Sequence, residues 1–332
     1  MVNGDLIILF NESDKINNFM AKKTVLSKTA ISEILKNYSF GDVKNFCLIK
    51  NGFMHSNYFL QTSGGKFVLR IFESRTDDQA MLEAKILKKL KNSSVPVPLI
   101  ISTNSGKLFS SYKEKRVAIF SFLEGSHVLE KNVTLAQIKN LGFAMGQLHS
   151  QLKNFKPKEI SSKEDYSIEY IKKILLKIKK DYPDFPRKLE TSIVNILNKI
   201  KIPPLPKGIN HGDMFDDNVL FLDNKISGVL DFDDCYYGNF LGDLGCGLVY
   251  WCINNKIDYQ KCRNFVKSYE SVRMLNVKEK MYLYEQTQII ALVHLVNLLE
   301  DKINWRKITR PAKVLNLLVN TSKEDFLRGI FS

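Results

Sequence analysis

Two short segments carry the oxygen-bearing side chains that phosphoryl transfer requires. Residues 209–218 contain Asp213 and Asn218, and residues 228–233 contain Asp231. Mg²⁺ prefers carboxylate and amide oxygens, so Asn218 and Asp231 are the candidate metal ligands. A further carboxylate must lie within hydrogen-bond reach of the acceptor hydroxyl to take its proton, and Asp213 is that candidate base. The pattern predicts phosphoryl transfer from ATP with Mg²⁺.

The spacing of these three residues is that of a kinase catalytic loop and the metal-binding Asp that follows it. Between them, residues 219–221 and 226–230 read as two strands joined by a turn at 223–224. Such a hairpin would place Asn218 beside Asp231. Asp-rich loops also occur as ordinary turns, but the fixed spacing and the intervening hairpin favour the catalytic interpretation.

Upstream, a strand and a helix are predicted to hold the phosphates. Arg70 lies in an apolar strand over residues 67–72, and Glu83 lies in an amphipathic helix over residues 77–91. In a kinase, a basic residue on such a strand contacts the α- and β-phosphates and pairs with a Glu on the following helix. We expect Arg70 and Glu83 to pair in this way. The alternative is two surface charges with no contact.

Two further segments could bind other parts of the nucleotide. The turn at residues 51–57 stands where a kinase has its glycine-rich loop, and its backbone amides and Ser56 could cap the phosphates. A plain polar hairpin is the other interpretation. An apolar strand that begins at Val117 runs into Glu-Gly, which predicts the crossing between two lobes. Backbone groups from Ser121 to Leu123 could then face the adenine edge.

The segment around the motif is acidic within a basic protein. Between His211 and Asp243 eight aspartates face a single lysine. Four of these aspartates have no required part in phosphate chemistry and could hold the ammonium group of an acceptor through charge-assisted bonds. They are Asp216, Asp217, Asp233 and Asp234. Only about a dozen residues separate Asp231 from Asp243, too few for a long activation loop, so a protein substrate is not expected.

Length and charge set the class of protein. The chain has 332 residues, 44% of them hydrophobic, which exceeds the usual size of one core and favours two lobes. The formal net charge of +14 suggests nucleic acid, but the lysines are scattered along helical faces such as residues 171–180. No RNA-binding motif accompanies them. We therefore expect a small-molecule partner and no nucleic acid.

Nothing in the sequence indicates a membrane or an oxidising compartment. The longest apolar run, residues 289–299, is interrupted by His294 and Asn297 and is too short to span a bilayer. The N-terminus has the wrong order of charges for a signal peptide. The five cysteines are odd in number and form no Cys-x-x-Cys pair, which predicts reduced thiols, with Cys235 an ordinary half-buried one. The protein is expected to be cytoplasmic.

Several stretches together resemble the aminoglycoside phosphotransferase and choline kinase superfamily. They are residues 67–73, 120–125, 141–149 and 211–245, in the order of that family. Within it, residues 122–125, 205–221 and 226–232 are most similar to bacterial homoserine kinases of the phosphotransferase-like type. The resemblance implies an α+β, bilobal, protein-kinase-like fold. Residues 1–40 would form an N-terminal extension with a helix, 41–125 a lobe with an antiparallel sheet, a helix and the hinge, and 126–332 a larger, mostly helical lobe.

The resemblance also implies ATP and Mg²⁺ as cofactors and a small amino alcohol as acceptor, with L-homoserine as first choice. By it Asp243 would bond the catalytic-loop backbone, although an ordinary helix N-cap fits Asp243 as well. His211 is expected to brace the same loop. Asp231 is followed by Asp-rich residues at 233–234, where such homoserine kinases usually have aromatic ones. An aminoglycoside or choline-like acceptor is therefore the alternative, and a nucleotide-binding pseudokinase scaffold is the rival class.

Overall fold

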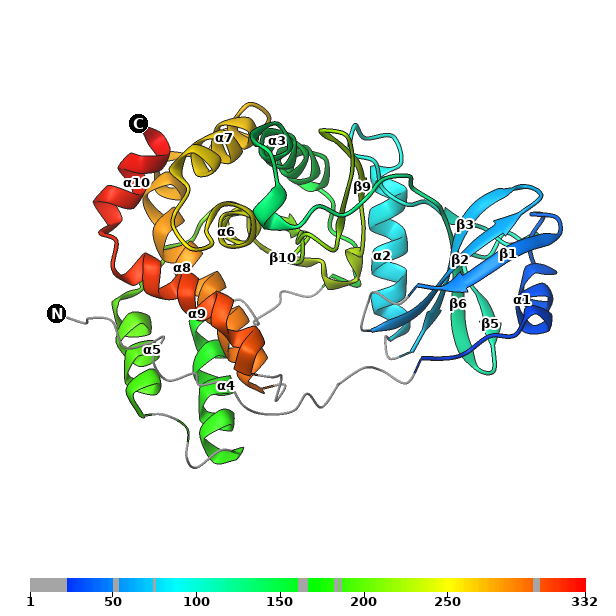
Figure 1. Cartoon of the computed structure of the whole chain (residues 1–332), viewed down its shortest axis with the longest axis horizontal. Coiled ribbons are helices and arrows are strands. Elements are labelled where there is room, and N and C mark those ends of the chain that lie inside the picture. The colour runs from blue at the N-terminus through cyan, green and yellow to red at the C-terminus, as the bar shows by residue number, and fades with distance from the viewer. Residues whose placement is uncertain are drawn as a thin grey trace.

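An antiparallel sheet and a mainly helical body form the two lobes of the chain (Figure 1). The computed structural model describes residues 23–49, 54–73, 76–160, 167–181, 185, 187–300 and 305–332. This α+β, two-lobed arrangement is the one expected from the sequence.

The N-terminal lobe consists of a six-stranded sheet with a helix on each face. Its strand order is β1-β2-β3-β6-β4, and β5 pairs with β6. The strands are β1 (Val43–Leu48), β2 (His55–Thr62), β3 (Gly65–Phe72), β4 (Ile100–Ile101), β5 (Ser110–Tyr112) and β6 (Lys115–Ser121), and the helices are α1 (Lys28–Leu35) and α2 (Asp77–Leu90).

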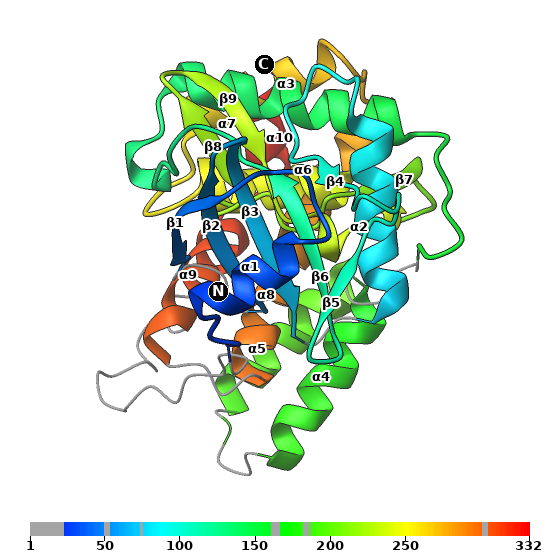
Figure 2. The same ribbon diagram turned by 90° about the vertical axis from the view of Figure 1, so that its right-hand side faces the viewer.

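The period-two alternation of strand side chains decides which helix each residue meets. In β3, Leu69 and Ile71 join the buried cluster that contains α1, whereas Phe72 joins the cluster that contains α2. Arg70 points to the α2 face as well, since it contacts Glu83. Figure 2 shows α1 in front of the sheet. Because α1 shares the core of the sheet, it belongs structurally to the N-terminal lobe.

The larger lobe contains helices and two small two-stranded sheets. Its helices are α3 (Leu135–Leu152), α4 (Ile168–Asp181), α5 (Arg187–Lys199), α6 (Leu241–Gly247), α7 (Tyr259–Glu270), α8 (Val277–Glu300), α9 (Trp305–Val319) and α10 (Lys323–Phe331), with a π-helical turn at Leu248–Cys252. The strands are β7 (Lys207–Asn210), β8 (Val219–Leu222), β9 (Lys225–Val229) and β10 (Tyr236–Asn239), paired as β10-β7 and β8-β9.

The predicted hairpin between the two halves of the motif is present as β8 and β9. Val219 pairs with Val229, and Leu230 N–H donates to the Asn218 carbonyl at 2.8 Å. The crossing between the lobes rests on this hairpin, because Ser126 and Phe221 exchange both backbone hydrogen bonds at 2.9 Å. The hairpin therefore connects the catalytic segments to the segment that joins the lobes.

Two expectations about the rest of the chain can be compared with the structure. In the described ranges, no helix has the length and apolar character needed to cross a membrane. All five cysteines lie in those ranges and are free thiols, and Cys235 is buried. The free thiols agree with the sequence, but Cys235 is more deeply buried than the half-buried side chain that was expected.

Candidate active site

The loop between β7 and β8 holds Asp213 and Asn218 in contact. Asn218 Nδ2 donates to the Asp213 backbone carbonyl at 2.8 Å and to Asp213 Oδ2 at 3.0 Å. Phe215 N–H also donates to the Asp213 carbonyl, at 2.8 Å, which closes the loop as a tight turn. Because Nδ2 is held by Asp213, the Asn218 amide turns Oδ1 the opposite way. That oxygen is the atom a metal ion would use.

Asp231 directly follows β9 and lies beside this loop. Its backbone φ of +62° is in the left-handed region, which Asp tolerates better than most residues but which still costs about 1 kcal/mol or more. Its Oδ1 is buried, accepts no hydrogen bond from any described residue, and lies 3.3 Å from Arg70 Nη1. A strained backbone and a buried oxygen with no hydrogen bond fit a metal ligand.

Arg70 and Glu83 form the buried pair that the sequence predicted. Arg70 Nη1 lies 3.0 Å from Glu83 Oε1 and 3.2 Å from Oε2, and the two side chains are 11% and 1% exposed. Burial raises the pKa of the Glu83 carboxyl even though Arg70 lowers it. Asn57 Oδ1 accepts from Arg70 Nε at 3.0 Å, and Phe120 lies beneath the guanidinium at 5.1 Å. The guanidinium is thereby held toward Asp231.

Ser56 lies on the other face of the sheet from Arg70. Its hydroxyl donates to Glu73 Oε1 at 2.5 Å and accepts from Thr24 N–H at 2.9 Å, within a polar cluster beside α1. The adjacent residues of β2 reach the site instead: Asn57 contacts Arg70, and His55 contacts the segment after Asp231. Sequence reasoning missed both, although the alternation along β2 carried the signal. Residues 51–53 of the expected phosphate loop lie outside the described residues.

The four extra aspartates divide into different environments. Asp233 is buried, with Oδ2 at 3.2 Å from His55 Nε2, so it joins the two lobes. Burial raises the pKa of Asp213 well above its ordinary value, and the charges of Asp234, Asp217, Asp231 and Asp233 raise it further. These carboxylates therefore lie close enough to the candidate base to disfavour its ionised form.

Asp216 lies in the same loop, and its backbone contacts the segment that follows the crossing between the lobes. Its carbonyl accepts from His127 Nδ1 at 3.1 Å, and its side chain is half-buried, whereas that of Asp217 is exposed. Among the described residues, no three His, Cys, Asp or Glu side chains gather closely enough to hold a metal ion by themselves. A metal ion at Asn218 and Asp231 would need further oxygens, such as those of phosphates or water.

His211 and Asp243 hold the backbone of the catalytic loop through hydrogen bonds. Asp243 Oδ2 accepts from His211 N–H at 2.7 Å and Oδ1 from Gly212 N–H at 2.9 Å. The His211 ring bridges the two segments, because Nε2 lies 2.9 Å from the Leu230 carbonyl and Nδ1 accepts from Asp213 N–H at 3.2 Å. Burial lowers the pKa of His211, which favours the neutral ring that these bonds need.

A second buried histidine, which sequence reasoning did not single out, extends this support. His149 Nε2 lies 2.9 Å from Asp243 Oδ2, and Nδ1 lies 2.7 Å from the Tyr269 hydroxyl. Tyr269 in turn accepts from Arg273 at 3.0 Å. Burial lowers the pKa of His149 and keeps the ring neutral despite the carboxylate beside it. This chain fixes the position of the Asp243 carboxylate.

The two hinge residues differ in what they offer a ligand. Ser121 N–H donates to the Leu99 carbonyl, and its hydroxyl accepts from Leu99 N–H, both at 2.9 Å, so the hydrogen-bonding groups of Ser121 are used within the sheet. The backbone N–H and C=O of Leu123 make no hydrogen bond to another residue in the described ranges. Leu123 packs against Gly228 of β9, where a Cβ would approach it to 2.9 Å.

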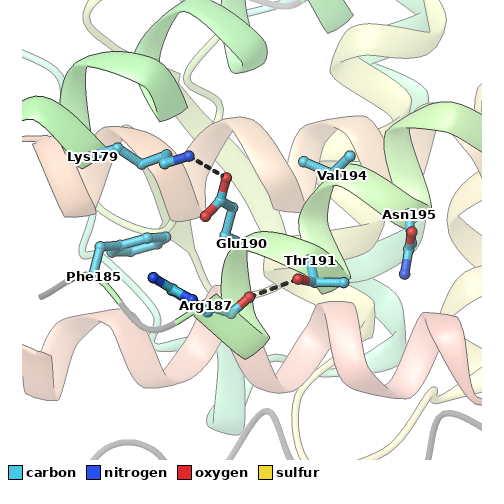
Figure 3. Close-up of a pocket in the computed structure, with 7 residues that line it drawn as sticks. All are labelled: Lys179, Phe185, Arg187, Glu190, Thr191, Val194 and Asn195. Carbon is cyan, nitrogen blue, oxygen red and sulfur yellow. Dashed lines mark hydrogen bonds and ion pairs between the residues drawn. The ribbon is translucent and has the colours of Figure 1, made fainter. Parts of the chain in front are cut away.

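One surface pocket lies away from these residues. It is formed between α4 and α5 and contains the Lys179–Glu190 ion pair (Figure 3). It includes none of the catalytic-loop, metal-ligand or hinge residues, so the chemistry described above does not involve it.

Comparisons with known proteins give the family and the fold of this chain. Residues 45–270 match the model of the phosphotransferase enzyme family. The homoserine kinase of Bartonella henselae is 29% identical over 263 residues, which cover 77% of this chain and 81% of the relative. An amicoumacin kinase solved with AMP-PNP and Ca²⁺ has a TM-score of 0.68 at 13% identity, covering 90% of this chain and 96% of that one.

A microcompartment-associated aminopropanol kinase has a TM-score of 0.64 at 17% identity, covering 91% of this chain and all of the other. At these identities the two solved structures are evidence for the fold alone, and both confirm the kinase-like architecture expected from the sequence.

Proposed function

The chain belongs to the phosphotransferase enzyme family and is a small-molecule phosphotransferase, and we propose that it transfers the γ-phosphoryl group of ATP, bound with Mg²⁺, to the hydroxyl of L-homoserine. The observation that carries the proposal is the hairpin that brings Asn218 and Asp231 together next to Asp213, with Arg70 directed at the same place. This arrangement has one position for an acceptor hydroxyl and one for phosphate oxygens.

The described residues fit MgATP. Asn218 Oδ1 and the buried Asp231 Oδ1 are hard oxygen ligands suited to Mg²⁺. Arg70, held by Glu83, would contact the phosphates, and the Leu123 backbone would face the adenine edge. When bound, the nucleotide and cation supply the phosphoryl group and neutralise its developing charge.

Asp213 is the proposed base that orients the acceptor hydroxyl and takes its proton. Burial and the neighbouring carboxylates raise the pKa of Asp213, and a carboxylate whose ionised form is disfavoured is a stronger base. Asn218 holds Oδ2 at 3.0 Å, so the carboxylate has a fixed orientation. Asp243 and His211 hold the backbone on which Asp213 sits, which keeps the base in position.

The choice of acceptor rests on the relatives and on charge. The homoserine kinase relative supports a hydroxy amino acid, and carboxylates at Asp216, Asp217 and Asp234 could attract its ammonium group. The buried Asp233, already in contact with His55, is better suited to holding the lobes together.

An acceptor screen tests this function. ADP release should be measured with ATP and Mg²⁺ over L-homoserine, 3-aminopropan-1-ol, ethanolamine, choline and an aminoglycoside. We expect the highest kcat/KM for L-homoserine. A preference for choline or the aminoglycoside would overturn the substrate assignment. If none of these alcohols causes ADP release, the proposed activity is overturned.

A further inference from the structure

An aromatic cluster includes a residue of the catalytic loop. Phe215, two residues after Asp213, has its ring centre 4.0 Å from that of Tyr250 and 5.2 Å from that of His294. The Tyr250 and His294 rings are 5.0 Å apart. These three side chains come from the loop, the π-helical turn and α8. They form a half-buried aromatic wall beside the candidate base.

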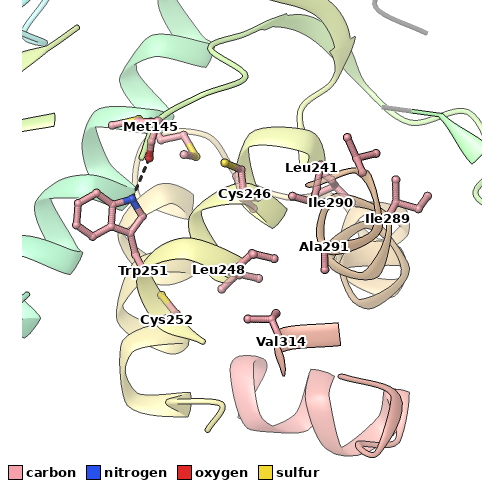
Figure 4. Close-up of a cluster of buried hydrophobic side chains, with 14 of the residues drawn as sticks. Met145, Leu241, Cys246, Leu248, Trp251, Cys252, Ile289, Ile290, Ala291 and Val314 are labelled. Carbon is pink, nitrogen blue, oxygen red and sulfur yellow. Dashed lines mark hydrogen bonds between the residues drawn. The ribbon is translucent and has the colours of Figure 1, made fainter. Parts of the chain in front are cut away.

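Arg310 on α9 reaches the same wall. Its guanidinium carbon lies 5.0 Å from the centre of the Tyr250 ring, and Nη2 donates to the Tyr250 carbonyl. Helix α9 packs against α8, the helix that carries His294 (Figure 1). Val314, one turn after Arg310, lies in the buried cluster that also contains Trp251, the neighbour of Tyr250 (Figure 4).

The turn that carries Tyr250 is tied directly to the catalytic loop. Trp251 Nε1 donates to the Met214 carbonyl at 2.9 Å. Leu248–Cys252 is π-helical, and such turns occur often at functional sites. Two hydrogen bonds therefore link Arg310 to the catalytic loop through this turn: one from Arg310 to the Tyr250 carbonyl and one from Trp251 to the Met214 carbonyl.

Charges of both signs surround the Tyr250 side chain. Burial raises the pKa of Tyr250, Arg310 lowers it, and Asp213 and Asp216 raise it. The guanidinium and the two loop carboxylates are therefore within electrostatic reach of a single phenol. A zwitterionic acceptor placed here would have both a cation and carboxylates nearby to pair with its two charged groups.

We propose that Arg310 binds the carboxylate of the acceptor, so that the enzyme selects hydroxy amino acids over amino alcohols that lack a carboxylate. The inference rests on the proposed function and adds a specificity-determining residue to it. Guanidinium groups pair with carboxylates through two parallel hydrogen bonds, and their planar face stacks on aromatic rings, as Arg310 does on Tyr250.

A matched pair of acceptors tests the proposal. L-Homoserine and 3-aminopropan-1-ol differ only in the carboxylate, so their kcat/KM ratio measures its recognition. Losing a charge-assisted contact should lower kcat/KM for homoserine by about 10- to 100-fold in Arg310→Met. The value for 3-aminopropan-1-ol should change by less than about threefold. Arg310→Lys should recover part of the homoserine activity.

The matched control is Arg263→Met. Arg263 on α7 also donates to a backbone carbonyl, that of Gly329, at 2.8 Å, but it is not one of the residues of the candidate active site. The Arg263→Met variant should leave the ratio of kcat/KM for the two acceptors unchanged. If Arg310→Met lowers activity on both acceptors equally, Arg310 only supports the fold and the inference is overturned. A wild-type preference for 3-aminopropan-1-ol also overturns it, and overturns the choice of homoserine as acceptor, while leaving phosphoryl transfer to a small alcohol intact.

A binding measurement separates this inference from the proposed function. If wild-type protein phosphorylates neither acceptor, the proposed function fails. Calorimetric titration of L-homoserine into the protein with AMP-PNP and Mg²⁺ then still tests Arg310. Binding that Arg310→Met weakens at least tenfold supports the inference, whereas equal binding, or none in wild-type protein, contradicts it.

Discussion

Replacing Glu83 with Gln removes the charge of the carboxylate that holds Arg70 while keeping its shape. Glu83 is 1% exposed and accepts from Arg70 Nη1 at 3.0 and 3.2 Å. Removing one partner of a buried pair typically costs about 3–5 kcal/mol. Gln keeps one acceptor oxygen, and Asp231 at 3.3 Å recovers part of the loss. We therefore expect the free energy of unfolding to fall by about 2–4 kcal/mol.

The same change should weaken nucleotide binding. With Glu83 neutral, the Arg70 guanidinium is drawn toward Asp231. It then no longer contacts the phosphates, and it occupies an Asp231 oxygen that the metal ion would otherwise use. A loss of about 1.4 kcal/mol in binding corresponds to a tenfold higher KM for ATP. Urea denaturation followed by tryptophan fluorescence gives the stability, and steady-state kinetics at saturating acceptor give the KM.

Glu190→Gln is the control for that experiment. Glu190 pairs with Lys179 at 2.7 Å, but the side chains are 23% and 45% exposed and lie away from the site (Figure 3). Such a pair contributes less than about 1 kcal/mol, and KM for ATP should not change. Equal losses in the two variants, or an unchanged stability and KM in Glu83→Gln, would refute the reasoning.

Three further predictions follow from the geometry of the loop. Asp231→Asn should raise the Mg²⁺ concentration for half-maximal activity at least about tenfold in a metal titration, because a neutral oxygen replaces a charged ligand, and an unchanged requirement would argue against a metal role. Asp213→Asn should raise the midpoint temperature of thermal unfolding of the ligand-free protein at neutral pH. Burial raises the pKa of Asp213 in the folded state, so the wild-type protein loses stability as the pH rises through that pKa, whereas Asn carries no charge at any pH. Thermal unfolding across pH should show this gain shrinking toward the unfolded pKa of about 3.9, and a gain that grows there would contradict the sign. Asp243→Asn should lower kcat about 100-fold and stability by about 1–3 kcal/mol, since one loop N–H would face an amide donor, whereas normal kcat in the folded variant would show that the brace is dispensable.

The local part of the site could be predicted from the sequence. Asp213, Asn218 and Asp231 are joined by a hairpin short enough that strand register alone places them together. The Arg70 and Glu83 pair followed from a strand and a helix of clear periodicity. In both cases the chain separation is small and the intervening element is regular.

The parts that depend on tertiary packing could not be predicted. Ser56 was expected at the phosphates, but the pleat of β2 turns it toward α1 and directs His55 inward. The contact of His55 with Asp233 spans 178 residues, and no local pattern marks it. Arg310 reaches Tyr250 because α9 packs against α8, which the sequence around residue 310 does not reveal.

Direct detection of the product tests the central claim. Wild-type protein and Asp213→Asn should be incubated with ATP, Mg²⁺ and L-homoserine, and the phosphate monoester followed by phosphorus NMR. Wild-type protein should form ADP and the phosphorylated acceptor. Asp213→Asn should be slower by about 10²- to 10⁴-fold while binding AMP-PNP with similar affinity. An Asp213→Asn variant with the wild-type rate, or wild-type protein that forms no phosphorylated alcohol, would contradict the account.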